Sequence, residues 1–167
     1  MKAQIIRSGL FLVLMLSLLG CAMGTVDSIE SGNKAEQNSR VLIATQKSDF
    51  KQAVISEIRD TLERNSCYIK VVDVKRLPNE STQSFHSIII LNECMAGRPD
   101  PRVESFIDNV PDKQKVIILT TGRLEGWKPE SQEVDAMTSA SVMDRSKAIG
   151  QSLADKALEI IRSQRNL

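Results

Sequence analysis

The sequence has little of the residue types on which several common kinds of functional site depend. One histidine and three cysteines leave almost no material for a zinc site or a histidine relay, and a Ser-His-Asp enzyme would depend entirely on His86. Aromatic residues make up 4% of the chain, which is few for a protein that stacks rings. The 22 basic and 21 acidic residues almost cancel, so no strong field attracts nucleic acid. We therefore expect no metal site and no nucleic-acid partner, and no nucleophile–base pair indicates an enzyme.

The first twenty residues have the pattern of an export signal. Lys2 and Arg7 precede an apolar stretch at 10–19, which is shorter than the roughly 20 residues that a membrane-spanning helix needs. The stretch ends in Leu-Leu-Gly-Cys, which resembles the bacterial lipobox. The resemblance implies cleavage before Cys21 and a diacylglyceryl group on its sulfur, usually with a further acyl chain on its amine, and two or three chains anchor a protein stably. Two alternatives stay open: an ordinary signal peptide with an incidental cysteine, and a retained membrane anchor.

The residue after the lipobox cysteine bears on the destination of the protein. Ala22, and not an aspartate, follows Cys21, which in Gram-negative envelopes resembles lipoproteins sent to the outer membrane. We therefore expect an exported cell-envelope protein, held by membrane lipid through acylated Cys21 and facing the periplasm where an outer membrane exists. Cleavage removes two basic residues and no acidic one, which changes the formal net charge from +1 to −1.

The remaining chain has the length and composition of one globular domain, with 41% hydrophobic and 26% charged residues overall. Residues 22–39 are small and polar without a helical or strand period, which is typical of a flexible linker. We expect a cleaved signal peptide at 1–20, lipidated Cys21 and a tether at 21–39, a folded domain at 40–163 and a short tail at 164–167.

Apolar runs and helical spacing alternate along the domain. Strands are predicted at 41–44, 68–74, 85–91, 115–120 and 134–138. Helices are predicted at 49–64, from 101 to about 110, and at 144–162. Residues 75–84 carry at most one helical turn, and 121–133 show no helical period. Buried strands that alternate with amphipathic helices predict an α/β domain with a mostly parallel, doubly wound sheet.

The third predicted strand and the residues after it carry a resemblance to a known fold. The segment 85–91 is followed by Gly-Arg-Pro-Asp-Pro at 97–101 and by the pair Phe106-Ile107. This sequence resembles small flavodoxin-like proteins, and the likeness extends over about 40–162. It implies five strands in the order 2-1-3-4-5 with much reduced second and fourth helices. It also implies that a ligand binds at the carboxyl ends of the strands, where the order reverses.

Flavodoxins hold the phosphate of FMN in the first of these loops, with glycine, hydroxyl groups and a helix N-terminus. Here the loop consists of Thr45, Gln46, Lys47 and Ser48, which are candidate ligand-binding residues, followed by Asp49 and Phe50. Ser48 takes the place of the glycine, Phe50 that of a hydroxyl residue, and Asp49 adds a negative charge. We therefore expect a degenerate phosphate loop, with FMN as a possible cofactor only. The alternative for these residues is a turn in which Ser48 or Asp49 caps the next helix.

The resemblance places two further loops at the same crevice. Asn92 and Arg98 follow the third strand, and Thr121, Gly122 and Trp127 follow the fourth, so these five are further candidate ligand-binding residues. Trp127 lies where flavodoxins often stack the flavin ring, although a lid over the core is the alternative for this residue. Cys94 in the same crevice is either a reactive thiol or a small buried side chain.

A second motif near the C-terminus competes with the first. Residues 135–141 resemble the attachment sequence of exported proteins that carry covalent FMN, with Ser139 for the usual glycine and Ser141 for the usual threonine. The resemblance implies FMN esterified through its phosphate to Ser141. The alternative is that Ser141 and Asp144 form a capping box for the last helix.

The histidine is predicted to be structural, and the remaining cysteines are predicted to be free thiols. Cys67 and Cys94 fall at opposite ends of the predicted sheet, so no disulfide is expected. His86 starts the third strand, away from the crevice. Two functional hypotheses follow: a lipid-anchored module that binds a small molecule or an envelope protein, and an FMN-dependent electron carrier.

Overall fold

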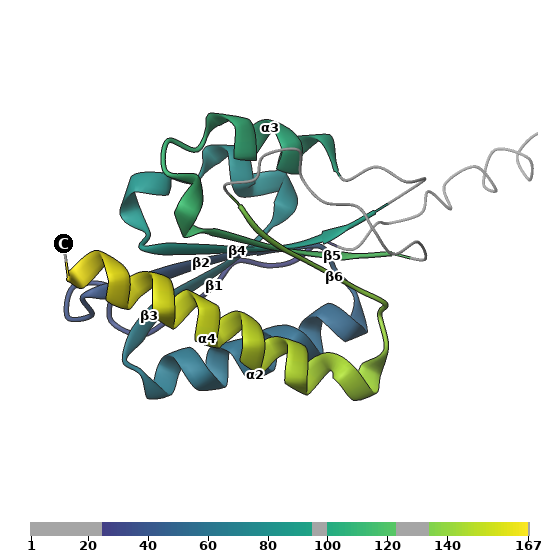
Figure 1. Cartoon of the computed structure of the whole chain (residues 1–167), viewed down its shortest axis with the longest axis horizontal. Helices are drawn as coiled ribbons and strands as arrows, with labels where there is room; N and C mark the ends of the chain where they lie inside the picture. Colours follow the sequence, from purple (N-terminus) through teal and green to yellow (C-terminus); the bar gives the residue numbers. More distant parts are fainter. Residues whose placement is uncertain (1–24, 95–99, 123–133, 167) are drawn as a thin grey trace, which may run out of the picture.

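The protein forms a central sheet with helices on both faces (Figure 1). This computed structural model describes residues 25–94, 100–122 and 134–166. The strands are β1 (Ile29–Ser31), β2 (Ser39–Thr45), β3 (Cys67–Asp73), β4 (Ser87–Glu93), β5 (Val116–Thr121) and β6 (Asp135–Ser139). The α-helices are α2 (Asp49–Arg64), α3 (Pro101–Asn109) and α4 (Ser146–Arg165). In the described residues no helix is both long and apolar enough to cross a membrane.

The sheet is mixed, with the strand order β1-β3-β2-β4-β5-β6. Strands β2 to β6 run parallel to their neighbours, and β1 pairs antiparallel with β3, where Ile29 faces Val71 and Ser31 faces Ile69. The predicted doubly wound α/β architecture is confirmed. The predicted sheet of five parallel strands is incomplete, because β1 adds a sixth strand that covers the edge of β3.

Strand β1 also corrects the prediction that residues 21–39 form only a tether. Within it, β1 is part of the sheet, and Val26 packs against the core while its backbone N–H donates to Asp73 Oδ2 at 3.0 Å. A three-residue strand is too short to show a period in the sequence. Its position is decided by the unpaired edge of β3, which the sequence pattern of residues 22–39 does not reveal.

Two hydrophobic cores explain why the strands read as continuous apolar runs. In β2, Val41 and Ile43 face the core under α2 and α4, whereas Leu42 and Ala44 face the core under α3. Figure 1 shows these helices as separate layers below and above the sheet. Since both faces are covered, every position of β2 from Val41 to Ala44 is apolar and fully buried.

The helix boundaries follow local signals at two of three N-termini. Ser48 caps α2 and Asp100 caps α3, with Pro101 in the first turn, as predicted. The last helix differs: a short 3₁₀ helix, η5 (Met143–Arg145), precedes α4, and no side chain caps α4. The predicted capping box of Ser141 and Asp144 is therefore wrong.

Two further predictions concern segment lengths. Residues 75–84 were predicted to carry at most one helical turn, but the structure has two short 3₁₀ helices here, η2 (Val74–Asn79) and η3 (Thr82–Ser84). The crossover is still reduced as expected, because it contains no α-helix. At the C-terminus, α4 extends to Arg165, where the guanidinium Nη2 donates to Ser39 Oγ at 2.6 Å. The predicted tail at 164–167 is therefore helical over its first two residues.

Candidate functional site

The ends of the parallel strands bring several predicted residues to one edge of the sheet, which we call the carboxyl edge: the last residues of β2 to β5 and the described loops that follow them. Thr45 ends β2 and Thr121 ends β5, and Asn92 is the second-last residue of β4. Thr121 Oγ1 donates to the carbonyl oxygen of Asn92 at 3.2 Å, and the N–H of Cys94 donates to the Thr121 carbonyl at 2.8 Å. Hydrogen bonds thus fix the two loops to each other.

A close contact between two loops explains the glycine at position 122. A β-carbon there would lie 3.2 Å from Cys94 Cβ, so the two loops approach each other closely across the edge. The glycine therefore allows tight backbone packing, and this packing accounts for the residue without a ligand.

The first loop caps the N-terminus of α2 with a side chain of its own. Ser48 Oγ accepts the backbone N–H of Lys51 at 3.1 Å, so one of the free donors at the start of α2 is already occupied. Asp49 lies in the first turn with its negative charge, and Phe50 is buried in the core. A bound phosphate would compete with the serine for this donor and would be repelled by the aspartate.

Lys51 is a site residue that the sequence analysis missed. Its side chain is 1% exposed, Nζ donates to Gln46 Oε1 at 3.0 Å and lies 3.6 Å from Glu93 Oε2. Burial lowers the pKa of Lys51, while the charge of Glu93 acts in the opposite direction. The available signal is spacing: Lys51 precedes Val54 by three positions and Ile58 by seven, so it lies on the apolar face of α2.

The network continues from the first loop to the start of α3. Gln46 Nε2 donates to Asp100 Oδ2 at 3.3 Å, and Arg102 donates to the same carboxylate through Nε at 2.8 Å and Nη2 at 2.7 Å. The hydrogen bond from Arg102 is the main reason why the pKa of Asp100 is lowered, although burial opposes it. Lys51, Gln46 and Asp100 thus join β2, α2 and α3 across the edge.

Asn92 contributes the one buried donor of this edge that lacks a partner among the described residues. Its side chain is completely buried; Oδ1 accepts the N–H of Asp100 at 3.4 Å, and Nδ2 has no hydrogen-bond partner there. A buried amide N–H without a partner costs free energy, so this group is suited to donate to an acceptor that the described residues do not supply.

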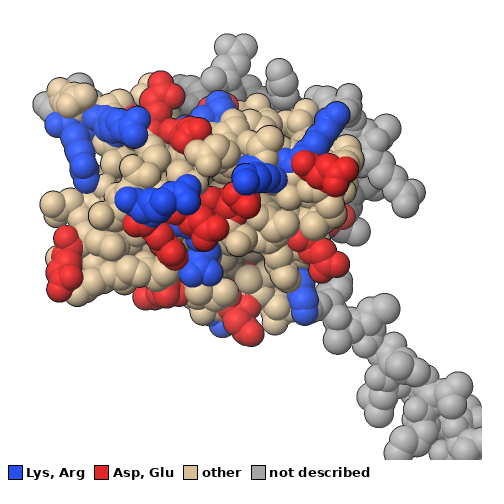
Figure 2. All heavy atoms as spheres, turned by 90° about the horizontal axis from the view of Figure 1, so that it is seen from below, with Lys and Arg blue, Asp and Glu red and all other residues tan. Residues whose placement is uncertain are grey.

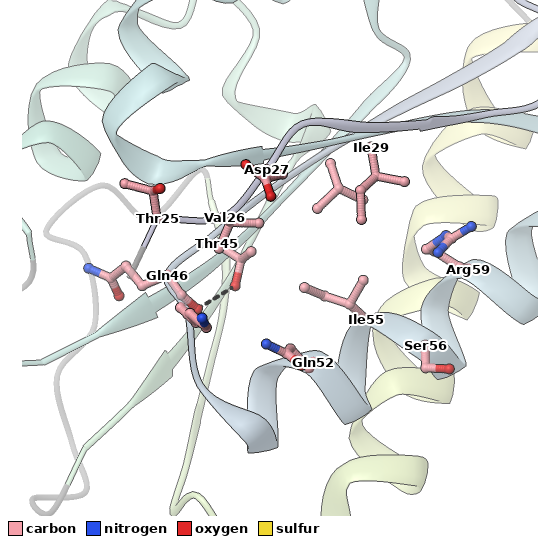
Figure 3. A pocket seen from close by; sticks show the side chains of 12 residues that line it. Thr25, Val26, Asp27, Ile29, Thr45, Gln46, Gln52, Ile55, Ser56 and Arg59 are labelled. Atoms are coloured by element: carbon pink, nitrogen blue, oxygen red, sulfur yellow. Dashed lines mark hydrogen bonds between the residues drawn. The ribbon is translucent and has the colours of Figure 1, made fainter. Parts of the chain in front are cut away.

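A pocket of about 390 Å³ lies beside the first loop (Figure 3). Its walls come from the N-terminal segment, from α2 and from the first loop, and β3 contributes Val71. The lining residues are Thr25, Val26, Asp27, Ile29, Thr45, Gln46, Lys47, Gln52, Ile55, Ser56, Arg59 and Val71. Three predicted site residues, Thr45, Gln46 and Lys47, thus line a cavity, but one formed with the residues that were predicted to be a tether.

The remaining predicted sites are placed as follows. Ser141 is exposed after β6, whose last residue pairs with Thr121. Cys21, Arg98 and Trp127 lie outside the described residues. Within the described ranges no group of three or more histidine, cysteine or acidic residues is arranged to hold a metal ion.

The cysteines lie at opposite ends of the sheet as predicted, with Cys67 buried and Cys94 partly exposed, and His86 lies just before β4. Cys67 begins β3 and Cys94 follows β4, at opposite ends of the sheet, and both are free thiols. His86 Nδ1 accepts the N–H of Arg40 at 3.1 Å, and the N–H of His86 donates to the Arg40 carbonyl at 2.9 Å. Burial, reinforced by the nearby charge of Arg40, lowers the pKa of His86.

The described residues do not fit FMN held in the manner of flavodoxins. Ser48 occupies the position of the phosphate-loop glycine and uses the Lys51 N–H, Asp49 places a negative charge in the first helical turn, and the buried ammonium of Lys51 is engaged by Gln46 and Glu93. The serine hydroxyl and the aspartate charge therefore both oppose a phosphate at this helix N-terminus.

Solved flavodoxins resemble this chain in three dimensions. Oxidised flavodoxin 2 from Bacillus cereus matches with a TM-score of 0.52 and 14% identity, over 72% of this chain and 99% of that chain. Two-electron reduced flavodoxin from Megasphaera elsdenii matches with a TM-score of 0.49 and 17% identity, over 69% and 98%. No known family matches the sequence, and no curated protein matches it. At such identity the likeness concerns the fold alone: the protein has a flavodoxin-like α/β fold with a mixed sheet.

Proposed function

We propose that this protein is an exported lipoprotein, anchored through Cys21, whose flavodoxin-like domain binds a small molecule in the pocket under its N-terminal segment. The observation that carries the proposal is that pocket, whose volume of about 390 Å³ falls within the range of small-molecule sites. In the first loop beside it, Ser48 occupies the Lys51 N–H, so we assign binding to the pocket and not to a phosphate loop.

The lining of the pocket indicates the chemistry of the ligand. Val26, Ile29, Ile55 and Val71 provide apolar surface, and Ile29 leaves 44% of its area exposed. Lys47 and Arg59 provide two positive charges against the one negative charge of Asp27, and Arg59 Nη2 also donates to Glu63 Oε1 at 3.1 Å. A small molecule with an apolar body and one acidic group matches both features.

An apolar sulfonate dye, 8-anilinonaphthalene-1-sulfonate, tests this pocket by fluorescence and calorimetry on the folded protein. We expect one site, about tenfold weaker binding in Ile55→Asp because a carboxylate would enter the apolar wall, and a smaller loss in Arg59→Gln. Arg162→Gln, on the exposed side of α4, is the matched control. Unchanged binding in a folded Ile55→Asp variant would exclude the pocket as the site.

The second candidate is an electron carrier with FMN attached covalently to Ser141. The observation that favours it is that Ser141 is exposed and does not cap α4, so the structural alternative for this motif is lost. Bound FMN would supply one- and two-electron transfer. We rank this candidate second because the motif departs from the attachment sequence at Ser139 and at Ser141 itself.

Mass spectrometry of the denatured protein from its own envelope separates the two candidates. A mass increase of one FMN that persists in Ser139→Ala and is lost in Ser141→Ala would establish the covalent flavoprotein. A protein without that increase, and without flavin absorbance before denaturation, is the result that the binding-module proposal expects.

A further inference from the structure

The N-terminal segment joins the domain at a defined end. Because β1 runs antiparallel to β3, the chain enters at the carboxyl edge and passes toward the opposite, amino edge. The entry point is fixed by the hydrogen bond from Val26 N–H to Asp73 Oδ2, and Thr25 lines the pocket beside Thr45. The C-terminal helix ends at the amino edge, where Arg165 contacts Ser39 (Figure 1).

The length of chain between anchor and domain limits how the domain can stand on a membrane. Val26 follows Cys21 by five positions, so the two are at most about 18 Å apart even in a fully extended chain. The seven residues of β3 alone are about 23 Å long. If the amino edge rested on the bilayer, Val26 would lie farther from the bilayer than the chain can reach.

We propose that the carboxyl edge, with the pocket and the Lys51 network, faces the bilayer that holds the anchor, and that its partner there is the lipid headgroup layer. This inference rests on the lipidation of Cys21 in the proposed function. A ligand of the pocket then reaches it from the membrane side, and membrane-borne amphiphiles have the shortest path.

The charges around this edge indicate how the contact is held. Lys47, Lys75 and Arg102 are balanced by acidic neighbours, and the face covered by α2 and α4 also carries both signs interspersed (Figure 2). A surface of mixed sign gains little from anionic lipids. The short link between Cys21 and Val26, and not electrostatic attraction, therefore sets the orientation of the domain on the bilayer. A zwitterionic lipid such as phosphatidylcholine is then a sufficient partner.

Lysine acetylation read by mass spectrometry tests the orientation on the lipidated protein in phosphatidylcholine vesicles. Lys47 and Lys75 are exposed at the carboxyl edge, whereas Lys34 is exposed in the turn after β1 at the amino edge. We expect severalfold slower acetylation of Lys47 and Lys75 than in a soluble variant that lacks residues 1–21, with Lys34 unchanged.

The control is a lipidated variant with twenty Gly-Ser residues inserted between residues 24 and 25. The insertion raises the r.m.s. span of the link to about 25–30 Å, and acetylation of Lys47 should return to the soluble rate. Two results in a lipidated protein would overturn the orientation while leaving the anchor intact: slower acetylation of Lys34, or acetylation of all three lysines at the rates of the soluble protein. A mature protein without lipid on Cys21 would overturn both the anchor and the orientation, and the intact mass distinguishes these outcomes.

Discussion

Ser48 is the residue that most directly determines how the first loop is used. Its hydroxyl oxygen accepts a hydrogen bond from the Lys51 N–H, which in a phosphate-binding loop would remain available to the ligand. Ser48→Ala should lower the free energy of unfolding by about 1 kcal/mol, whereas Ser48→Gly should cost only a few tenths. Urea unfolding of both variants measures the difference. Equal stability of Ser48→Ala and the parent protein would contradict a capping role.

His86 gives a pH dependence that can be assigned without ambiguity, because it is the chain's single histidine. Its pKa is lower in the folded state than the value of about 6.5 expected in the unfolded chain. As the pH falls through that range, the unfolded chain takes up a proton before the folded protein does, so stability is lost on acidification.

His86→Asn retains an acceptor for the Arg40 N–H and removes this titration. The parent protein should lose stability relative to the variant between about pH 7 and pH 5, by an amount that urea unfolding at several pH values measures. Parallel stability curves over that range would show that His86 is not shielded from protonation in the folded state.

Among the elements, α2 and α4 have the tightest contact. A β-carbon at Gly150 would lie 2.6 Å from Glu57 Cβ and 2.8 Å from the Val54 carbonyl oxygen. Helix propensity alone would make Gly150→Ala stabilising by about 1 kcal/mol. Since the neighbours of Gly150 are backbone and the base of a side chain, the substitution should instead destabilise by about 1–3 kcal/mol.

Ala148→Gly is the matched control for this prediction, because residue 148 is exposed on the same helix. It should cost about 1 kcal/mol through propensity alone. Thermal or urea unfolding reports the sign of both changes. A stabilised Gly150→Ala variant would mean that the two helices do not approach each other closely at this position.

A helix or strand can be predicted from the sequence when the spacing of its own residues determines it. The β2 run and the spacing of Phe50, Val54 and Ile58 predicted β2 and α2 because both faces of the sheet are covered by apolar layers. β1 could not be predicted, since its place is decided by the edge of β3, and the η5 turn before α4 replaced the expected cap at Ser141.

The sequence predicted which edge of the sheet carries the candidate site, but not the buried lysine or the pocket there. Strand ends that follow apolar runs located Thr45, Asn92 and Thr121 at one edge. Spacing places Lys51 on the apolar face of α2, but lysine is rarely buried unless paired, so the spacing alone does not show that its side chain is 1% exposed. The pocket depends on a long-range contact between Val26 and Asp73, which cannot be predicted from the residues around either position.

At the scale of the whole molecule, a flavodoxin-like fold is combined with a first loop that does not fit a phosphate and with an N-terminal segment that builds a pocket. Fold likeness alone does not imply flavin chemistry, because function depends on the site placed on the fold. We therefore propose, and do not infer from the fold, that the protein is a lipid-anchored binding module whose site lies next to its anchor.

Native mass spectrometry of the protein purified from the membranes of its own cells tests anchor, cofactor and ligand together. We expect a chain that begins at Cys21, carries the diacylglyceryl group, lacks FMN and releases a small amphipathic molecule on activation. A full-length chain without lipid, or a mass that includes FMN, would contradict it.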